Sequence, residues 1–365
     1  MVIDVDSHSQ PRRQDHMVEP EYAHLIPRSY INKKGTMRTI LNHKIWFQAD
    51  SGEKNEDYTV TSSRARALSD ASVRYEMITT AGIDFQFLMA GTPTDFCYVD
   101  GKAGAAFCRS YNNFLYNTFM KPYPKTFSGL PSLPLQDSAE AIKELERCVK
   151  DLNMRTFVMA TNWNGIDMAD PYWWNFYDSA RELGIRTIII HIDTIPPDVK
   201  WVGKERLKVL GPDGTRGRRI VATPFEYCTN IVNLVFGGMM DAFPEFNFLF
   251  LESCAEFAVP LKHRTKESIE ELPYLRDMLT HPLDHYFDRI YYLMEGYMLE
   301  NGGSLLSYLL NEVGADNLLF GSDFPHEDSL EMCRKINDTA IVPKEAKEKI
   351  LGRNAAKLLG NDLLN

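Results

Sequence analysis

The chain has 365 residues, of which 44% are hydrophobic, and these values suit one large α/β barrel or two ordinary domains. Its 50 acidic and 40 basic residues give a net charge of −10. That balance argues against a nucleic-acid or anionic-membrane partner, because both attract an excess of Lys and Arg. No apolar run reaches membrane-spanning length, and residues 1–10 have a strand pattern in place of a signal peptide, so we expect a soluble cytoplasmic protein.

The six cysteines are scattered and form no CxxC pair. In a reducing compartment such cysteines are typically buried small hydrophobic residues, so we predict no disulfides and no cysteine nucleophile. The cysteines are Cys97, Cys108, Cys148, Cys228, Cys254 and Cys333.

The first predicted strand covers residues 2–8, where apolar and polar residues alternate. Residues two apart share a face of a strand, so Asp4, Asp6 and His8 are expected to point the same way. At the C-terminal end of a first barrel strand, Asp6 and His8 would form a compact metal anchor. The alternative is the solvated face of a half-exposed strand.

Two segments interrupt the regular pattern. Residues 11–62 are polar, contain prolines and are weakly periodic, which predicts an insertion with a small hairpin near 41–47. Residues 196–219 are rich in Pro, Gly, Lys and Arg and predict a long exposed loop, of the kind that serves as a lid or an assembly contact.

Elsewhere strands and helices alternate along the chain. Strands are predicted at 82–91, 127–135, 155–162, 185–193, 246–253 and 285–295 and from 318, and helices at 63–80, 104–122, 138–152, 172–184, 225–244, 259–271 and 304–317, with two short ones in 342–360. This alternation predicts a parallel sheet wrapped by helices. We therefore expect residues 1–365 to form one (β/α)8 TIM barrel without a second domain or an internal repeat.

Three chemically distinctive residues lie at predicted strand ends: His191, Glu252 and Asp323. A carboxylate such as Glu252, after a run of large apolar residues, is costly to bury unless it is paired or bound to a cation. Each residue also has a structural interpretation. His191 is then a satisfied core histidine, Glu252 an ion-pair partner of Lys262 or Arg264, and Asp323 the cap of the next helix.

The C-terminal ends of barrel strands meet at one face, where TIM barrels carry their active sites. Strands one, five, six and eight would bring Asp6, His8, His191, Glu252 and Asp323 to that face, which predicts a metal centre. Two imidazoles and three carboxylates favour manganese or iron(II), with zinc also possible, as one or two ions. Such an ion lowers the pKa of bound water to about 7 or clamps a substrate carboxylate.

Two of these residues are candidate catalytic groups, namely Asp323 and His191. Asp323 would be either a direct ligand or a general acid/base. His326, close behind it in the sequence, would be a neighbour that orients a ligand.

Several segments together resemble the amidohydrolase-related TIM-barrel family, in the branch of aminocarboxymuconate semialdehyde and resorcylate decarboxylases. They are VIDVDSH, GIDFQFL, LPLQD, ELGIRTIIIH, TPFEY, GGMMDAFPEFNFLFLES, GADNLLFGSDFPHED and ILGRNAAKLLG. The resemblance implies that Asp6 and His8 match the His-x-His pair of the first strand, with Asp in the first position. It likewise implies that His191 is the strand-five ligand and Asp323 the strand-eight Asp, and that Glu252 stands where many members have a His.

Three functional hypotheses follow from the residues and the resemblance. The first is a metal-dependent enzyme that hydrolyses or decarboxylates a small carboxylate-bearing substrate. The second is a dinuclear iron or manganese oxygenase, because the extra carboxylates are similar to those of the 2-aminoisobutyrate hydroxylase system, which pairs two homologous subunits. The third is a catalytically silent subunit of such a pair. A homo-oligomer, or a hetero-oligomer with a homologous subunit, is therefore expected.

Overall fold

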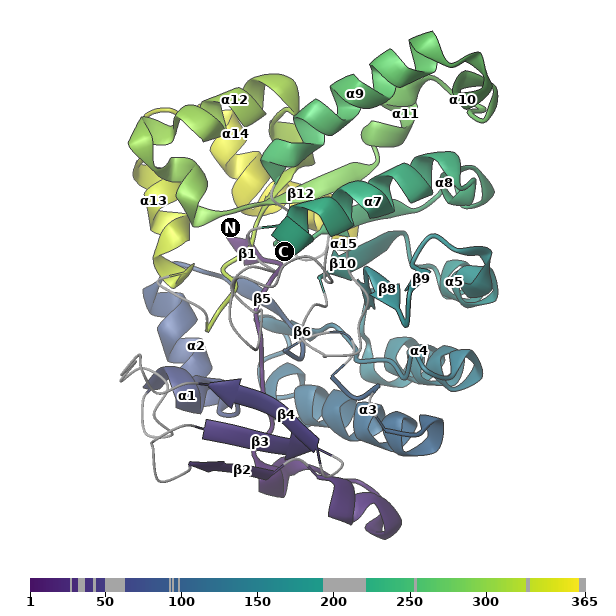
Figure 1. The fold of residues 1–365 in the computed structure, drawn as a ribbon. Coiled ribbons are helices and arrows are strands. Elements are labelled where there is room, and N and C mark those ends of the chain that lie inside the picture. The colour runs from purple at the N-terminus through teal and green to yellow at the C-terminus, as the bar shows by residue number, and fades with distance from the viewer. Residues whose placement is uncertain are drawn as a thin grey trace.

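The computed structural model describes residues 1–26, 28–31, 37–41, 44–49, 63–91, 93, 95–97, 99–192, 221–252, 255–325 and 329–360. Within these residues, eight parallel strands form two sheets, in the orders β1-β5-β6 and β13-β12-β11-β10-β7 (Figure 1). The strands are β1 (Ile3–Asp4), β5 (Phe85–Leu88), β6 (Phe127–Gly129), β7 (Val158–Ala160), β10 (Thr187–His191), β11 (Asn247–Phe250), β12 (Ile290–Met294) and β13 (Leu318–Phe320).

The first and last strands lie side by side, which joins the two sheets along one edge. The Val5 N–H donates to the Phe320 carbonyl at 3.2 Å, and the His8 N–H donates to the Phe324 carbonyl at 2.7 Å. The Asp323 N–H donates to the Asp6 carbonyl at 2.9 Å. The chain segments that carry Asp6, His8 and Asp323 are therefore paired by their backbones.

Helices surround the strands and follow them in sequence (Figure 1). The α-helices are α1 (Ser63–Ala67), α2 (Ala71–Thr80), α3 (Gly101–Leu115), α4 (Ser138–Leu152), α5 (Trp174–Glu182), α7 (Thr223–Phe236), α8 (Met239–Ala242), α9 (Ala258–Glu271), α10 (Pro273–Asp277), α11 (Leu283–Phe287), α12 (Ser304–Glu312), α13 (Met332–Asp338), α14 (Lys344–Glu348) and α15 (Asn354–Leu359). Two π-helical segments, η4 (Tyr116–Met120) and η12 (Lys349–Arg353), lead out of α3 and into α15. Short 3-10 segments are η1 (Arg13–Asp15), η2 (Pro20–Leu25), η5 (Pro171–Trp173), η7 (Ala255–Phe257), η8 (Gly296–Leu299), η9 (Asn301–Gly303), η10 (Ala315–Asn317) and η11 (Ser329–Glu331).

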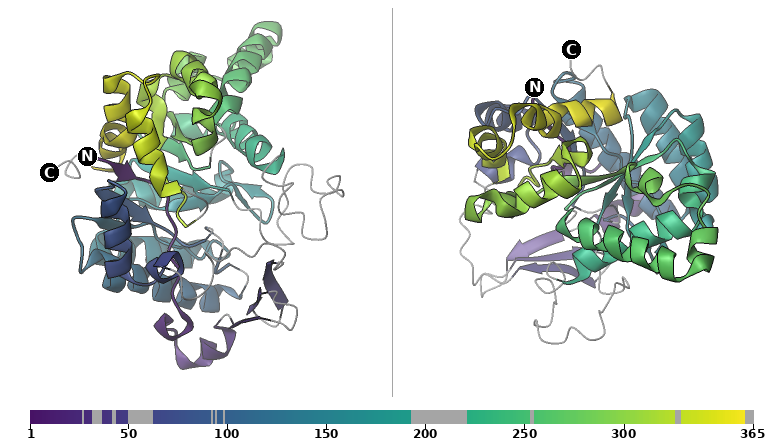
Figure 2. Two further views of the ribbon diagram at one scale, coloured as in Figure 1. Left: turned by 90° about the vertical axis from the view of Figure 1, so that its left-hand side faces the viewer. Right: turned by 90° about the horizontal axis from the view of Figure 1, so that it is seen from above.

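The inside of the barrel is filled by apolar side chains from alternate strand positions, including Val5, Ile189 and Leu293. The C-terminal helix α15 belongs to the same cluster, and the Thr187 hydroxyl donates to the Leu358 carbonyl at 2.9 Å. Both views of Figure 2 place the yellow C-terminal helices beside the N-terminus. This helix closes the end of the barrel at which the strands begin.

Several predicted boundaries differ from the structure. The strand predicted at 127–135 ends at Gly129, because Pro131 and Pro134 lack the N–H that a ladder needs. The strand predicted at 285–295 is preceded by helix α11 and starts only at Ile290. The helix predicted at 63–80 is divided into α1 and α2, because Asp70 caps the start of α2 by accepting from two backbone N–H groups.

The predicted insertion contains a three-stranded antiparallel sheet, formed by β2 (Arg28–Ile31), β3 (Met37–Leu41) and β4 (Lys44–Ala49). Leu41 pairs with Lys44, which confirms the hairpin predicted near 41–47. The sheet lies at the lower edge of the molecule in Figure 1. The loop predicted at 196–219 lies outside the described residues, and the single-domain organisation stays a prediction.

Two further expectations can be compared with the structure. Cys108, Cys148, Cys228 and Cys333 are free thiols, as predicted, and Cys254 lies outside the described residues. Among the described residues, no helix is both long and apolar enough to cross a membrane. A small two-stranded hairpin, β8 (Asn162–Trp163) and β9 (Ile166–Asp167), follows β7 and completes the described strands.

Candidate metal centre

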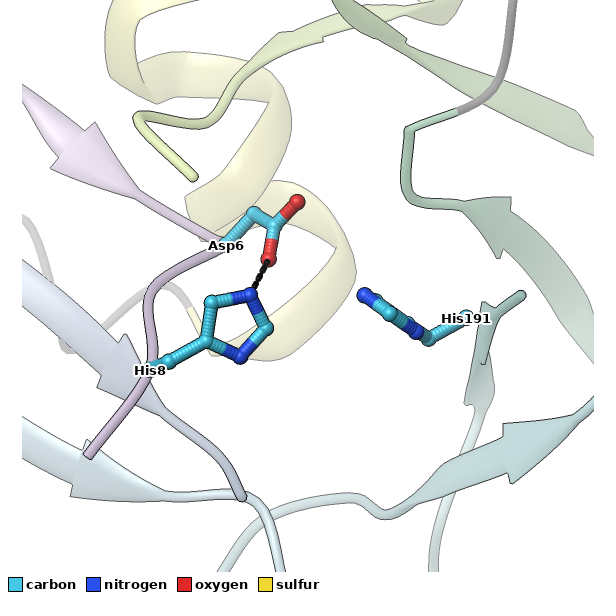
Figure 3. Close-up of side chains that lie close together, drawn as sticks. All are labelled: Asp6, His8 and His191. Atoms are coloured by element: carbon cyan, nitrogen blue, oxygen red, sulfur yellow. Dashed lines mark ion pairs between the residues drawn. The ribbon is translucent and has the colours of Figure 1, made fainter. Parts of the chain in front are cut away.

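Three side chains predicted as ligands converge at the end of the barrel where the strands finish. Asp6, His8 and His191 each offer one ligand atom, and these atoms lie within 4.8 Å of one another. All three residues are buried, with at most 4% of their surface exposed. Figure 3 shows His191, from the end of β10, pointing toward Asp6 and His8, which follow β1. The predicted convergence of strands one and five is confirmed.

The two imidazole rings are held in defined tautomers by backbone carbonyl groups. His8 donates its Nδ1–H to the Ala90 carbonyl at 2.8 Å, and His191 donates its Nδ1–H to the Ile192 carbonyl at 2.6 Å. A neutral ring with a proton on Nδ1 has its lone pair on Nε2. The rings meet edge to face with centroids 5.6 Å apart. Both Nε2 atoms are therefore prepared to bind a cation.

The surroundings of His8 favour a positive charge at its Nε2 atom. Nε2 lies 3.0 Å from Asp323 Oδ1 and 4.0 Å from Asp6 Oδ1. Burial lowers the pKa of His8, but the hydrogen bond and charge of Asp323 and the charge of Asp6 outweigh it and raise the pKa to about 9. In this geometry a proton or a metal ion must lie between Nε2 and the carboxylates, because an unprotonated lone pair would face negative oxygens.

Asp6 provides the test of whether these residues fit a metal ion. The residue is fully buried, and among the described residues neither carboxylate oxygen has a hydrogen-bond donor. Burial, followed by the charge of Asp323, raises its pKa well above the ordinary value. Buried polar groups nearly always have partners, and a carboxylate facing two imidazoles fits a divalent cation.

The strand-end acids Asp323 and Glu252 share an unusual backbone conformation. Their φ angles are +51° and +46°, whereas the other described residues with positive φ are asparagines or glycines. Left-handed conformations at such residues cost of order 1–3 kcal/mol and cluster at functional sites. The side chain of Asp323 is 21% exposed, so this carboxylate faces the buried cluster on one side and can be reached from outside on the other.

Gly321 allows the closest approach between the first and last strands at the site. A Cβ at this position would lie 2.7 Å from the Cβ of Asp6 and 2.7 Å from the side chain of Leu293. Only a residue without a side chain fits this space. The Gly-Ser pair before Asp323 therefore makes room for Asp6.

The other predicted residues have different outcomes. Glu252 is not part of the group of three, although its strand is hydrogen-bonded to β10 through the Leu251 N–H and the Ile190 carbonyl. Its suggested ion-pair partners bind elsewhere, Lys262 to Asp284 and Arg264 to Glu267. Asp323 faces His8, and His326 lies outside the described residues.

The expectation that Asp4 shares a face with Asp6 and His8 is wrong. The regular strand ends at Asp4, so the alternation of faces does not continue through Asp6. Asp4 accepts hydrogen bonds from the backbone N–H of Ser322 at 2.8 Å and from the side chain of Gln86 at 2.5 Å. It lies behind the site instead of within it.

Sequence reasoning missed Glu295, which directly follows β12. Leu293, two residues before it, fills the barrel interior, and the negative charge of Glu295 is among the causes that raise the pKa of Asp6. The available signal was its place at the end of a predicted strand, the same signal that identified Glu252.

The parallel barrel and the buried group of Asp6, His8 and His191 define an α/β-barrel protein with a site for a divalent metal at the C-terminal ends of its strands. The chain belongs to the amidohydrolase family, whose sequence model matches residues 24–360. The family expected from the sequence is therefore confirmed. The group of three ligand-capable side chains agrees with the expected divalent-metal cofactor.

Known proteins similar to the chain extend this assignment. It is 25% identical over 296 residues to a 2-amino-3-carboxymuconate-6-semialdehyde decarboxylase of Dictyostelium discoideum, covering 80% of this chain and 77% of that one. It is also 25% identical over 312 residues to a gamma-resorcylate decarboxylase of Polaromonas sp., and this match covers 81% of this chain and 89% of that one. Among solved structures, the chain is similar to a dihydroxybenzoic acid decarboxylase of Polaromonas sp. with bound manganese and an inhibitor. The TM-score is 0.70 at 19% identity, and the match covers 98% of this chain and 96% of that one. The predicted TIM-barrel fold is confirmed.

Proposed function

We propose that this protein is a metal-dependent carboxy-lyase that removes CO2 from a small carboxylate-bearing substrate. The observation that carries the proposal is the buried group of Asp6, His8 and His191 with Asp323 at 3.0 Å from His8. Similarity to decarboxylases that act on aminocarboxymuconate semialdehyde and resorcylate supports decarboxylation over hydrolysis.

In this proposal, Asp6, His8 and His191 hold the metal ion. Two imidazole nitrogens and a carboxylate leave coordination positions for other oxygen ligands, as catalytic sites require. A bound divalent cation supplies positive charge that fixes and neutralises the substrate's carboxylate and neighbouring oxygen. Burial of the three residues excludes water from one side and strengthens these electrostatic interactions.

Asp323 is the candidate general acid/base. Decarboxylation breaks a C–C bond, leaves its electron pair on the substrate carbon and needs a proton there as CO2 departs. Asp323 is partly exposed and lies beside the buried group, so it can hold a proton at the boundary between that group and the substrate space. His191, on the opposite side of the cluster, would help to hold the ion.

The first test replaces Asp323 by Asn in the manganese-loaded protein. We expect turnover to fall by about 100- to 10,000-fold, the range of a lost general acid/base. The assay follows release of 13CO2 from carboxyl-labelled 2,6-dihydroxybenzoate and 5-carboxyvanillate, and deuterium incorporation at the vacated carbon in D2O. Asp170→Asn is the matched control, because Asp170 caps η5 and Asn is an equally good cap.

If wild type released CO2 and Asp323→Asn released it at the same rate, the proposed role of Asp323 would be contradicted. Absence of CO2 release from both carboxylates, together with hydrolysis of an ester or amide analogue, would show hydrolase chemistry instead.

Metal analysis separates this proposal from the oxygenase alternative. The described residues contain one group of three ligand-capable side chains, which favours one ion per chain. Two redox-active ions per chain, with consumption of O2, would support the dinuclear oxygenase. A co-purifying homologous barrel and no turnover by the isolated chain would support the silent-subunit hypothesis. Assembly with a second subunit and a cytoplasmic location stay predictions.

A further inference from the structure

A buried polar network lies directly behind the candidate metal centre. It starts at Arg74 of α2, whose Nε–H donates to Gln86 Oε1 at 2.8 Å. Gln86, in β5, donates from Nε2 to Asp4 Oδ2 at 2.5 Å. All three side chains are fully buried. The guanidinium and the carboxylate are therefore connected through an amide and not by a direct ion pair.

Both ends of this network bind the backbone that carries the site residues. Arg74 donates from Nη1 to the His8 carbonyl at 3.1 Å. Asp4 Oδ1 accepts from the Asp6 N–H at 3.2 Å and from the Ser322 N–H at 2.8 Å. The network thus fixes the backbone of two cluster residues and of the residue before Asp323.

Arg74 also holds the residue that follows Asp323. Its guanidinium carbon lies 3.9 Å from the centre of the buried Phe324 ring, a cation–π contact in a desolvated setting. Asp323 is consequently held on both sides, by Asp4 through Ser322 and by Arg74 through Phe324. These contacts support its left-handed backbone, which is unfavourable without such restraint.

We propose that Arg74, Gln86 and Asp4 form a positioning network that sets the spacing between the β1 segment and the β13 segment for metal binding. None of the three belongs to the group of proposed ligands. They act by keeping His8 Nε2, Asp6 and Asp323 within the few tenths of an ångström that a coordination site tolerates. The inference rests on the proposed metal centre.

A network that only stabilised the fold would affect unfolding but not the affinity of the folded protein for metal. Partners that orient ligands typically change metal affinity by about 10- to 100-fold. Mn²⁺ affinity, measured on folded, metal-depleted full-length protein, therefore distinguishes the two roles.

The main test compares Arg74→Lys with Arg147→Lys. Lys keeps the charge at position 74 but cannot reach Gln86, the His8 carbonyl and the Phe324 ring at once. Arg147 is an equally well-bonded arginine, paired with Glu144 on α4 and away from the cluster. By calorimetric titration we expect Arg74→Lys to bind Mn²⁺ about tenfold or more weakly, in the range of lost outer partners, and Arg147→Lys to match wild type.

Two milder variants keep the test decisive if Arg74→Lys does not fold. Gln86→Met removes both amide hydrogen bonds at similar length, and Phe324→Leu removes the aromatic face. We expect roughly tenfold weaker Mn²⁺ binding for the first by loss of an outer partner. For Phe324→Leu we expect about threefold weaker Mn²⁺ binding, because the cation–π contact is lost.

Wild-type Mn²⁺ affinity in folded Gln86→Met and Phe324→Leu would overturn the inference. If wild type itself bound no Mn²⁺, the proposed metal centre would fail instead. Because Arg74 and Gln86 belong to one network, the double variant should lose less affinity than the product of the single losses. Fully independent losses would contradict a shared network.

Discussion

Two buried carboxylates in this molecule have opposite surroundings. Glu144, on α4, is 4% exposed and accepts hydrogen bonds from Arg147 Nε at 2.9 Å, Arg147 Nη2 at 2.7 Å and Asn112 Nδ2 at 2.7 Å. Asp6 is fully buried, and its oxygens accept no hydrogen bond within the described part of the chain. Its ion-pair contact with His8 Nε2 is 4.0 Å long.

The comparison shows how an acid with a full set of hydrogen-bond donors differs from a proposed metal ligand. A buried charge is costly unless it is paired and hydrogen-bonded. Glu144 meets this condition through a residue three positions away on its own helix. Asp6 does not meet it, and the groups around it are other potential ligands. A cation held by Asp6 and the two imidazoles would offset this cost.

The largest expected effect on Mn²⁺ affinity comes from Asp6→Asn. Loss of a ligand should weaken Mn²⁺ binding by roughly 100-fold or more, beyond the effect of an outer partner. Because the variant removes a buried carboxylate without donors, the free energy of unfolding of the metal-free protein should stay the same or rise by about 1 kcal/mol. Calorimetric Mn²⁺ titration and urea unfolding of the chelated protein measure the two quantities.

Glu144→Gln is the matched control with the reverse pattern. It weakens charge-assisted hydrogen bonds to Arg147, so stability should fall by about 1–3 kcal/mol while Mn²⁺ affinity stays at the wild-type value. Saturating Mn²⁺, at 100 times its Kd, should still stabilise this variant by about 2.7 kcal/mol. If Asp6→Asn and Glu144→Gln changed Mn²⁺ affinity and the free energy of unfolding in the same way, the proposed difference between the two acids would be contradicted.

The sequence was sufficient for the fold and for the convergence of Asp6, His8 and His191, whose role as metal ligands stays a prediction. His191 was recognisable because it ends a β-branched strand, and Asp6 and His8 because they lie two residues apart after an apolar start. Asp4 was misplaced because alternation of faces requires a continuing strand, and β1 ends there. Arg74 could not be found, because its role depends on which face of α2 meets β5 and Phe324.

Gly321→Ala should have the next largest effect. The added methyl would lie 2.7 Å from the Asp6 Cβ, a rigid atom next to the backbone, and 2.7 Å from Leu293. Overpacking of this kind costs about 1–3 kcal/mol, and here the strain displaces a proposed ligand. We expect Mn²⁺ affinity to fall about tenfold, the lower end of the effect of a lost orienting contact.

Gly296→Ala is the control for the glycine itself. The nearest atom to a Cβ at Gly296 is Met332 Sδ at 3.7 Å, an ordinary contact, and the residue also lies at the end of a barrel strand. Its Mn²⁺ affinity should match wild type. A loss in this variant as large as in Gly321→Ala would show that backbone freedom, and not the space for Asp6, is what the substitutions change.

The smallest expected effect on Mn²⁺ affinity is that of Glu295→Gln. This variant tests whether a carboxylate outside the group of three contributes to cation binding. Glu295 adds negative potential at Asp6 without belonging to the group of three ligand-capable residues. Removing its charge should weaken Mn²⁺ binding by roughly two- to fivefold, less than the 1.4 kcal/mol of a tenfold change. Glu300→Gln, farther along the same segment, should have no effect. If Glu295→Gln instead lost as much affinity as Asp6→Asn, Glu295 would be a ligand itself, and the site would be richer in carboxylates than the inner group alone.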